Sequence, residues 1–175
     1  MKILKFEKVE STQKTAKELV KKGEKEWTVI LAKEQTKGIG RKGNFWYSPK
    51  GGLYFSLVLP KTEIEKIKII RDLVPFLVSK VIFEEVKEKP FIKFPNDIYL
   101  RGRKIGGVMI QNFISKRRQI SILGIGINTN VKEFPEDLRE KATSLLIEFK
   151  KRVSNQKILK KILKEIQKVF ETISK

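Results

Sequence analysis

The stretch around residues 34–60 constrains the fold of this chain more than any other. Its pattern predicts a strand at 28–33, a glycine-rich basic loop, and a second strand at 53–59. Gly38–Gly43 has the G-x-G-x-x-G spacing of dinucleotide-binding folds, but a strand follows it where those folds need a helix. The sequence therefore argues against a dinucleotide fold and favours a loop between two strands.

The chemistry of this loop suits an anionic ligand. Its glycines allow positive φ and let backbone N–H groups approach a ligand closely, while Arg41 and Lys42 add positive charge. We therefore expect the loop to bind a carboxylate or phosphate group.

Composition limits the chemistry available elsewhere in the chain. With 175 residues and 40% hydrophobic content, we expect one domain over residues 1–175. No run predicts a membrane span or a signal peptide, so we expect a cytoplasmic protein without a membrane partner. There is neither cysteine nor histidine, so catalysis must rely on Lys, Arg, Asp, Glu, backbone amides and a bound metal.

The net charge of +19 would ordinarily suggest a nucleic-acid partner. The lysines, however, are spread over the whole chain, with no basic tail and no basic–aromatic alternation. We therefore expect no nucleic-acid function and interpret the charge as attraction for anionic ligands or an acidic carrier protein. A steep salt dependence of nucleic-acid binding would support the alternative.

Several motifs in a fixed order resemble those of biotin protein ligases. The resemblance rests on the glycine-rich loop with its Trp and Ser-Pro, on a Lys-x-Pro-Asn-Asp stretch followed by Gly-Arg-Lys-Ile-Gly-Gly, and on a Gly-Ile-Gly-Ile-Asn run. These motifs and two shorter ones occupy residues 35–56, 93–97, 102–107, 124–130, 10–13 and 142–145. The match covers most of the chain.

The resemblance implies an α+β fold with a mixed, mainly antiparallel sheet packed by helices, like the class II synthetase-like fold of biotin and lipoate ligases. Biotin ligases usually continue into a small β-barrel domain, and bifunctional members begin with a DNA-binding helix-turn-helix. We expect this chain to be the catalytic domain without either module, and so not to repress transcription.

The implied activity is ATP-dependent activation of biotin to biotinyl-5′-AMP and transfer to a lysine of a biotin carboxyl carrier protein. ATP and Mg²⁺ are the implied cofactors, and biotin is the substrate. A homodimer is one expectation for the oligomeric state, which the sequence does not decide. The alternatives are a lipoate or octanoate ligase of the same fold and a non-catalytic biotin-binding module.

The resemblance also assigns residues. Those implied to bind biotin are Ser11, Thr12, Gln35, Gly38, Gly107, Gly124 and Gly126. Those implied to bind ATP or the adenylate are Arg41, Lys42, Trp46 and Asn128. Lys104 and Arg41 are the implied catalytic residues, and Asp97 is the candidate Mg²⁺ ligand.

Several of these residues also have a structural alternative. Ser11 and Thr12 are favoured helix N-caps, and Asp97 suits turn capping. A lysine such as Lys104 usually lies at the surface, and Trp46 could be plain core. The glycines of the 124–128 run could merely relieve crowding between strands.

The remaining segments are interpreted as scaffold. Helical spacing of apolar residues predicts helices at 63–70 and 72–86, which Pro75 separates, and a last amphipathic helix over 158–173. Hairpins are expected around 101–103 and 115–118, with an irregular connection at 131–141.

Four positions depart from the family pattern. Ile39 and Asn44 stand where the family's loop normally carries arginines, so the loop presents less charge to phosphates. Phe94 replaces a Trp and Gln111 replaces a Glu.

Overall fold

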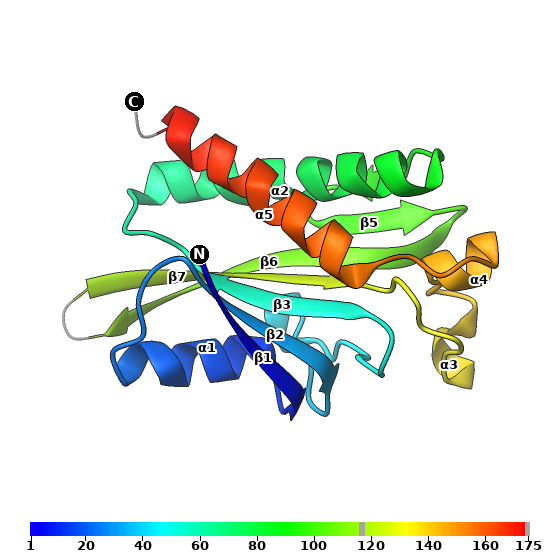
Figure 1. Cartoon of the computed structure of the whole chain (residues 1–175), viewed down its shortest axis with the longest axis horizontal. Helices are drawn as coiled ribbons and strands as arrows, with labels where there is room; N and C mark the ends of the chain where they lie inside the picture. The colour runs from blue at the N-terminus through cyan, green and yellow to red at the C-terminus, as the bar shows by residue number, and fades with distance from the viewer. Residues whose placement is uncertain (116–117, 174–175) are drawn as a thin grey trace. The chain divides into compact units, whose positions relative to one another are not determined.

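The computed structural model describes residues 1–115 and 118–173 (Figure 1). Its seven-stranded sheet has the order β1-β2-β3-β7-β6-β5-β4. The strands are β1 (Lys2–Val9), β2 (Thr28–Gln35), β3 (Leu53–Val58), β4 (Phe91–Lys93), β5 (Asp97–Leu100), β6 (Arg103–Ser115) and β7 (Arg118–Ile127). The helices are α1 (Thr12–Lys21), α2 (Ile64–Val86), α3 (Glu136–Arg139), α4 (Leu145–Phe149) and α5 (Asn155–Ile173).

Strand directions confirm the expected fold class. β1 pairs with β2 in parallel, whereas β2–β3, β4–β5 and β5–β6 are antiparallel pairs. The predicted turn at 115–118 contains Lys116 and Arg117, which lie outside the described residues. The result is a mixed, mainly antiparallel sheet with helices, as the sequence predicts.

The chain groups into two compact units. Unit 1 comprises Met1–Glu63 and Val108–Gly126, and unit 2 comprises Ile64–Gly107 and Ile127–Lys175. A single catalytic domain over residues 1–175 stays a prediction.

Unit 1 is built around a parallel strand pair. Parallel neighbours need a crossover connection, which α1 supplies between β1 and β2. α1 packs on β2 and β3, where Ala16, Val20, Ile30, Val58 and Ile122 form a buried cluster. Gly23 follows the helix with a φ of 104°, a conformation that glycine adopts readily at a helix end.

Unit 2 contains two long helices that pack against each other (Figure 1). α5 buries the apolar stripe that its sequence predicts, including Ile158, Ile162 and Ile166. Ion pairs join the helices at Lys80–Glu165, Lys161–Glu84 and Lys157–Glu85, with N–O distances of 2.9–3.0 Å. Among the described residues, no helix is long and apolar enough to cross a membrane.

The prediction of separate helices at 63–70 and 72–86 is wrong, because α2 is one helix of 23 residues with Pro75 inside it. A proline inside a helix costs about 3 kcal/mol. Here its ring is buried along with Val74 and Val78, so packing of this face offsets the lost backbone hydrogen bond. The expected irregular connection at 131–141 contains the short helix α3. The helix α4, which follows it, was not predicted from the sequence.

Candidate functional site

The glycine-rich loop of unit 1 folds back on itself. Isolated bridges join Gln35 to Ser48 and Ile39 to Phe45. At its tip a short 3-10 turn, Arg41–Gly43, places Lys42 at a φ of 57° and leaves the side chains of Arg41 and Lys42 exposed. The loop therefore presents two positive charges to solvent, as the sequence predicts.

Gly38 is required where the two arms of the loop approach each other. A Cβ at this position would collide with the carbonyl oxygen of Trp46 and would lie 2.6 Å from the Ser48 hydroxyl. The carbonyl of Gly38 accepts a hydrogen bond from the Trp46 N–H at 2.9 Å. Gly38 thus holds Trp46 in place, and its predicted contact with biotin stays a prediction.

Gln35 connects this loop to the start of α1. Its Oε1 accepts a hydrogen bond from the Thr12 N–H at 2.7 Å, and its Nε2 donates to the Ser48 hydroxyl at 2.8 Å. The Thr12 hydroxyl in turn accepts from Ser56 at 2.8 Å. Gln35 therefore satisfies one of the N–H groups that a helix N-terminus leaves unpaired.

Ser11 occupies the N-cap position of α1 without capping it. Its side chain makes no capping hydrogen bond, and its hydroxyl oxygen is buried without a hydrogen-bond partner in the described part of the chain. A buried hydroxyl without a partner is unfavourable, and such groups often mark ligand sites. The capping interpretation of the Ser11 side chain is therefore wrong, and its implied contact with biotin stays a prediction.

The glycine run of β7 is covered by two side chains. A Cβ on Gly124 would collide with the Gln13 amide, and one on Gly126 would lie 2.6 Å from Nε1 of Trp46. The glycines therefore admit a planar amide and an indole to the strand surface. The biotin contacts of Gly124 and Gly126 remain predictions, as does the nucleotide contact of Trp46, which is half-buried beside Gly126.

Gln13 is a candidate site residue that sequence reasoning missed. It is 3% exposed, and both polar atoms of its side-chain amide are buried without a hydrogen-bond partner among the described residues. It lies three and seven residues before Ala16 and Val20, on the buried face of α1. A glutamine at an apolar position of an amphipathic helix is the signal that could have revealed it.

In unit 2, Lys104 pairs with Asp97. The distance from Lys104 Nζ to Asp97 Oδ1 is 2.8 Å, and both side chains are about three-quarters buried, at 27% and 25% exposed. Asn96 Nδ2 also donates to Asp97 Oδ1 at 2.8 Å. Lys104 is thus an oriented cation rather than a solvated surface lysine, while Gly107 lies opposite Asp97 in the strand register.

Two hydrogen bonds hold the backbone of Lys104. Its N–H donates to the Lys141 carbonyl at 2.9 Å, and its carbonyl accepts from the Thr143 N–H at 3.0 Å. Nearby, the Glu148 carboxylate, 5% exposed, binds Arg103 and the Thr143 hydroxyl at 2.6 Å each. The 142–145 motif therefore holds the backbone of Lys104 through Thr143, which Glu148 binds in turn.

Asn128 lies in unit 2, directly after the last residue of β7. Its N–H donates to the Ile105 carbonyl at 2.7 Å, and its carbonyl accepts from the Leu145 N–H at 3.0 Å. Its side-chain Oδ1 is buried without a hydrogen-bond partner in the part of the chain that the structure describes. This orphan acceptor suits an exocyclic amino group such as that of adenine.

The residues around Asp97 do not fit a metal ion held by protein alone. The Asp97 carboxylate already binds Lys104 and Asn96. Across residues 1–115 and 118–173, no three His, Cys, Asp or Glu side chains gather as metal ligands. We therefore derive no step through a metal bound to Asp97.

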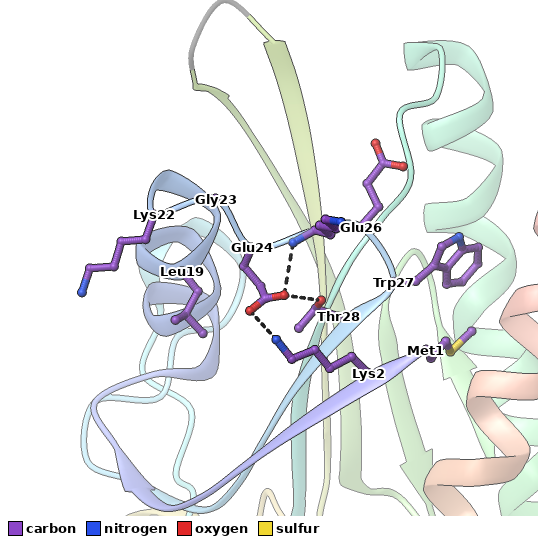
Figure 2. Close-up of a pocket in the computed structure, with 10 residues that line it drawn as sticks. Met1, Lys2, Leu19, Lys22, Gly23, Glu24, Glu26, Trp27 and Thr28 are labelled. Carbon is purple, nitrogen blue, oxygen red and sulfur yellow. Dashed lines mark hydrogen bonds and ion pairs between the residues drawn. The ribbon is translucent and has the colours of Figure 1, made fainter.

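A hollow of about 640 Å³ in unit 1 contains none of the predicted site residues (Figure 2). Figure 2 shows Glu24 at its centre, bound by Lys2 at 2.9 Å and Thr28 at 3.2 Å, with Trp27 at one side. The Lys2 ammonium, with smaller contributions from the Lys25 N–H and Thr28, lowers the pKa of Glu24. The Glu24 carboxylate is therefore satisfied by neighbouring groups of the chain, and we assign no ligand to this hollow.

Overall, the structure divides the predicted site residues between the units. Unit 1 holds Ser11, Thr12, Gln35, Gly38, Arg41, Lys42, Trp46, Gly124 and Gly126, and unit 2 holds Asp97, Lys104, Gly107 and Asn128. Hydrogen bonds or close approach link most members of the first set, and Arg41 and Lys42 lie at the exposed loop tip.

Known proteins resemble this chain closely. The chain is 39% identical over 140 residues to the bifunctional ligase/repressor BirA of Bacillus subtilis, covering 77% of this chain and 43% of that protein. It is 32% identical over 109 residues to biotin–protein ligase 2 of Arabidopsis thaliana, covering 59% of this chain and 33% of that protein. The chain thus spans less than half the length of these curated relatives.

A solved structure and a family model agree with these relatives. The biotin protein ligase of Aquifex aeolicus, in complex with biotin and ATP, superposes with a TM-score of 0.83 at 33% identity. That alignment covers 97% of this chain and 70% of the Aquifex chain. The model of the biotin/lipoate A/B protein ligase family matches residues 5–128, which include both Lys104 and the glycine-rich loop. The chain therefore belongs to the biotin/lipoate A/B protein ligase family.

Proposed function

We propose that this chain activates biotin with ATP and transfers it to a lysine of a biotin carboxyl carrier protein. In the first step a biotin carboxylate oxygen attacks the α-phosphorus of ATP, and the bond to pyrophosphate breaks. In the second step the acceptor amine attacks the acyl carbon, AMP leaves, and an amide forms. Both steps need positioning and charge neutralisation more than proton transfer, which suits a chain without histidine.

The observation that carries the proposal is the pair of buried, unpartnered polar side chains at the start of α1. The Ser11 hydroxyl can donate and accept, and the Gln13 amide offers one acceptor oxygen and two donor hydrogens. The ureido group of biotin offers one acceptor oxygen and two N–H donors. A ligand with this pattern would satisfy both side chains, whereas the lipoyl dithiolane ring would leave them unpaired.

Lys104 is the residue that we assign to the reacting groups. Its ammonium would stabilise the negative charge that develops on the carboxyl and α-phosphate oxygens. The ion pair with Asp97 and the backbone bonds to Lys141 and Thr143 hold the ammonium in place before substrates bind. Preorganisation of this kind lowers the reorganisation that the transition state would otherwise require.

Arg41, Lys42 and Asn128 complete the assignment. The two exposed cations of the loop tip would bind the phosphates of ATP or of the adenylate, and Asn128 Oδ1 would accept from the adenine amino group. Mg²⁺ would arrive with ATP and be held through its phosphates, as is usual for nucleotide sites. We place the reaction in the cytoplasm, with the carrier protein as the partner.

The test is biotin-dependent ATP–pyrophosphate exchange by the purified chain, compared with its Lys104→Ala and Lys161→Ala variants. Both variants lose one ion pair of similar length, 2.8 Å for Lys104 and 2.9 Å for Lys161, so Lys161→Ala controls for the loss of a lysine ion pair. We expect exchange by the wild type and Lys161→Ala, and a loss of about 100-fold or more in Lys104→Ala.

Two results would contradict parts of this proposal. Exchange that survives in Lys104→Ala would remove Lys104 from the mechanism. Biotin binding without any exchange by the wild-type chain would identify a non-catalytic biotin-binding module instead. Transfer to the acceptor is tested separately, by mass spectrometry of a carrier domain incubated with the chain, biotin and ATP.

A further inference from the structure

The carboxylate of Glu148 lies at the centre of a charge cluster in unit 2. Its Oε1 accepts from Arg103 Nη2 and from the Thr143 hydroxyl at 2.6 Å each. Its Oε2 lies 3.3 Å from Arg101 Nη1, which also donates to the Glu148 carbonyl at 3.2 Å. Figure 1 shows α4, which carries Glu148, beside the turn between β5 and β6. Two arginines and a threonine therefore bind one carboxylate that is only 5% exposed.

Two of these contacts lie on either side of Lys104. Arg103 is the residue before Lys104 in β6. Thr143 is fully buried, and its N–H donates to the Lys104 carbonyl at 3.0 Å. Glu148 therefore holds the chain around Lys104 twice, through the side chain of Arg103 and through Thr143.

Strand β6 is irregular next to Lys104. Tyr99 of β5 pairs with Lys104, but its neighbour Ile98 pairs with Gly106. β6 therefore has one extra residue, Ile105, at this point. An extra residue of this kind bends a strand and redirects its side chains. The direction of the Lys104 side chain thus depends on the contacts that hold this bulge.

The segment 142–145 supplies those contacts. Beside the bond from Thr143 to Lys104, the Asn128 N–H donates to the Ile105 carbonyl at 2.7 Å. The carbonyl of Asn128 in turn accepts from the Leu145 N–H at 3.0 Å. One segment therefore holds both Lys104 and Asn128, which we assign to the reacting groups and to adenine. Glu148 binds this segment through the Thr143 hydroxyl.

We propose that Glu148 is a positioning residue that sets the direction of the Lys104 ammonium. The inference rests on the proposed function, in which that ammonium stabilises the reacting groups. Side chains of successive strand residues point to opposite faces, so Arg103 and its partner Glu148 lie away from the Lys104 ammonium. That ammonium instead binds Asp97 at 2.8 Å. Glu148 thus acts through the backbone of Lys104 and not by contact with substrate.

The alternative is that the cluster only stabilises the turn between β5 and β6. That turn has contacts of its own, because Arg101 binds Glu88 at 2.6 Å and lies 4.9 Å from the Phe149 ring. Loss of the Glu148 carboxylate would leave these contacts in place. It would release Thr143, whose hydroxyl donates to that carboxylate. We therefore expect the loss to affect Lys104 more than the turn.

The first experiment compares biotin-dependent ATP–pyrophosphate exchange by Glu148→Ala and Glu148→Gln. Glutamine keeps one acceptor oxygen for Arg103 and Thr143, so its exchange should stay within about 3-fold of the wild type. Alanine should lower kcat about 10-fold or more and change the KM for biotin less than about 2-fold. Ile162→Ala, which truncates a buried side chain of α5 in the same unit, controls for lost stability. An equal fall in kcat in that control would overturn the proposal.

The same rates in a Lys104→Ala background separate positioning from general damage. Residues that act as one unit have non-additive effects on rate. Glu148→Ala should therefore lower the residual exchange of Lys104→Ala by less than about 2-fold. A loss as large as that in the wild-type background would overturn the proposal.

The second experiment needs no substrate. Ligand-free chains are briefly treated with acetic anhydride, and acetylation of each lysine is quantified by mass spectrometry. Lys104 is 27% exposed and bound to Asp97, so we expect it to react slowly in the wild type and in Glu148→Gln. Glu148→Ala should raise its rate about 3-fold or more relative to Lys161, which binds Glu84 and serves as the internal reference.

This readout keeps failure of the inference apart from failure of the proposed function. An unchanged rate at Lys104 in Glu148→Ala would overturn the inference even if the wild-type chain exchanges pyrophosphate. A raised rate at Lys104 in a chain without exchange would support the positioning role and contradict the proposed function alone.

Discussion

Replacing Gln13 by methionine is expected to stabilise the ligand-free chain and to weaken biotin binding. Both polar atoms of the Gln13 side chain are buried without a partner among the described residues, and each such group costs about 1–3 kcal/mol. Methionine has a similar shape and no polar group to leave unpaired. The free energy of unfolding should therefore rise by about 1–3 kcal/mol, measured by urea denaturation.

The affinity for biotin should change in the opposite direction. Loss of the amide that pairs the ureido group should weaken binding about 10- to 100-fold in isothermal titration calorimetry. Gln35→Met is the matched control, because its amide bonds to Thr12 at 2.7 Å and to Ser48 at 2.8 Å. That variant should be destabilised by about 2–4 kcal/mol. Destabilisation by Gln13→Met, or unchanged biotin affinity, would refute the reasoning.

Three further predictions concern the stability of the chain. Ser11→Ala should raise the unfolding free energy by about 1–3 kcal/mol, because it removes a buried hydroxyl that has no partner among the described residues. Ser144→Ala, which removes a cap that accepts from the Ile147 N–H at 3.1 Å, should instead cost about 1–2 kcal/mol. Gly38→Ala should cost about 2–4 kcal/mol in the same denaturation assay, because its Cβ would displace Trp46 and Ser48. Burial raises the pKa of Tyr54, so its stabilisation is complete below the unfolded-state pKa of about 10 and is lost at higher pH. Wild-type stability should therefore fall more steeply above that pH than the stability of Tyr54→Phe.

Local sequence patterns predict most strands and the last helix because their signals are local. Alternation, turn residues and the apolar stripe of α5 are readable from neighbouring positions. α2 could not be predicted as one helix, because burial of Pro75 by distant residues decides whether the helix continues. Short helices such as α3 and α4 depend on tertiary contacts and carry little signal of their own.

For the site, the order of the motifs identifies the loop and Lys104. The sequence cannot show which side chains find hydrogen-bond partners. The pairing of Gln35 with Thr12 joins residues 23 positions apart, and that of Lys104 with Asp97 depends on strand register. Ser11 and Ser144 both precede a helix in the sequence, but only the structure shows that the Ser144 side chain caps its helix and that the Ser11 side chain does not. Gln13 becomes visible as a site residue only when its buried amide is seen without a partner.

The most direct test of the central claim is a competition between acids in one reaction. The purified chain is incubated with ATP, Mg²⁺ and equal amounts of biotin and lipoate, and the adenylates are separated and identified by mass spectrometry. The account predicts biotinyl-5′-AMP with equimolar pyrophosphate, because the buried hydroxyl of Ser11 and amide of Gln13 match a ureido group. Lipoyl-5′-AMP as the main product, or no adenylate with either acid, would contradict it.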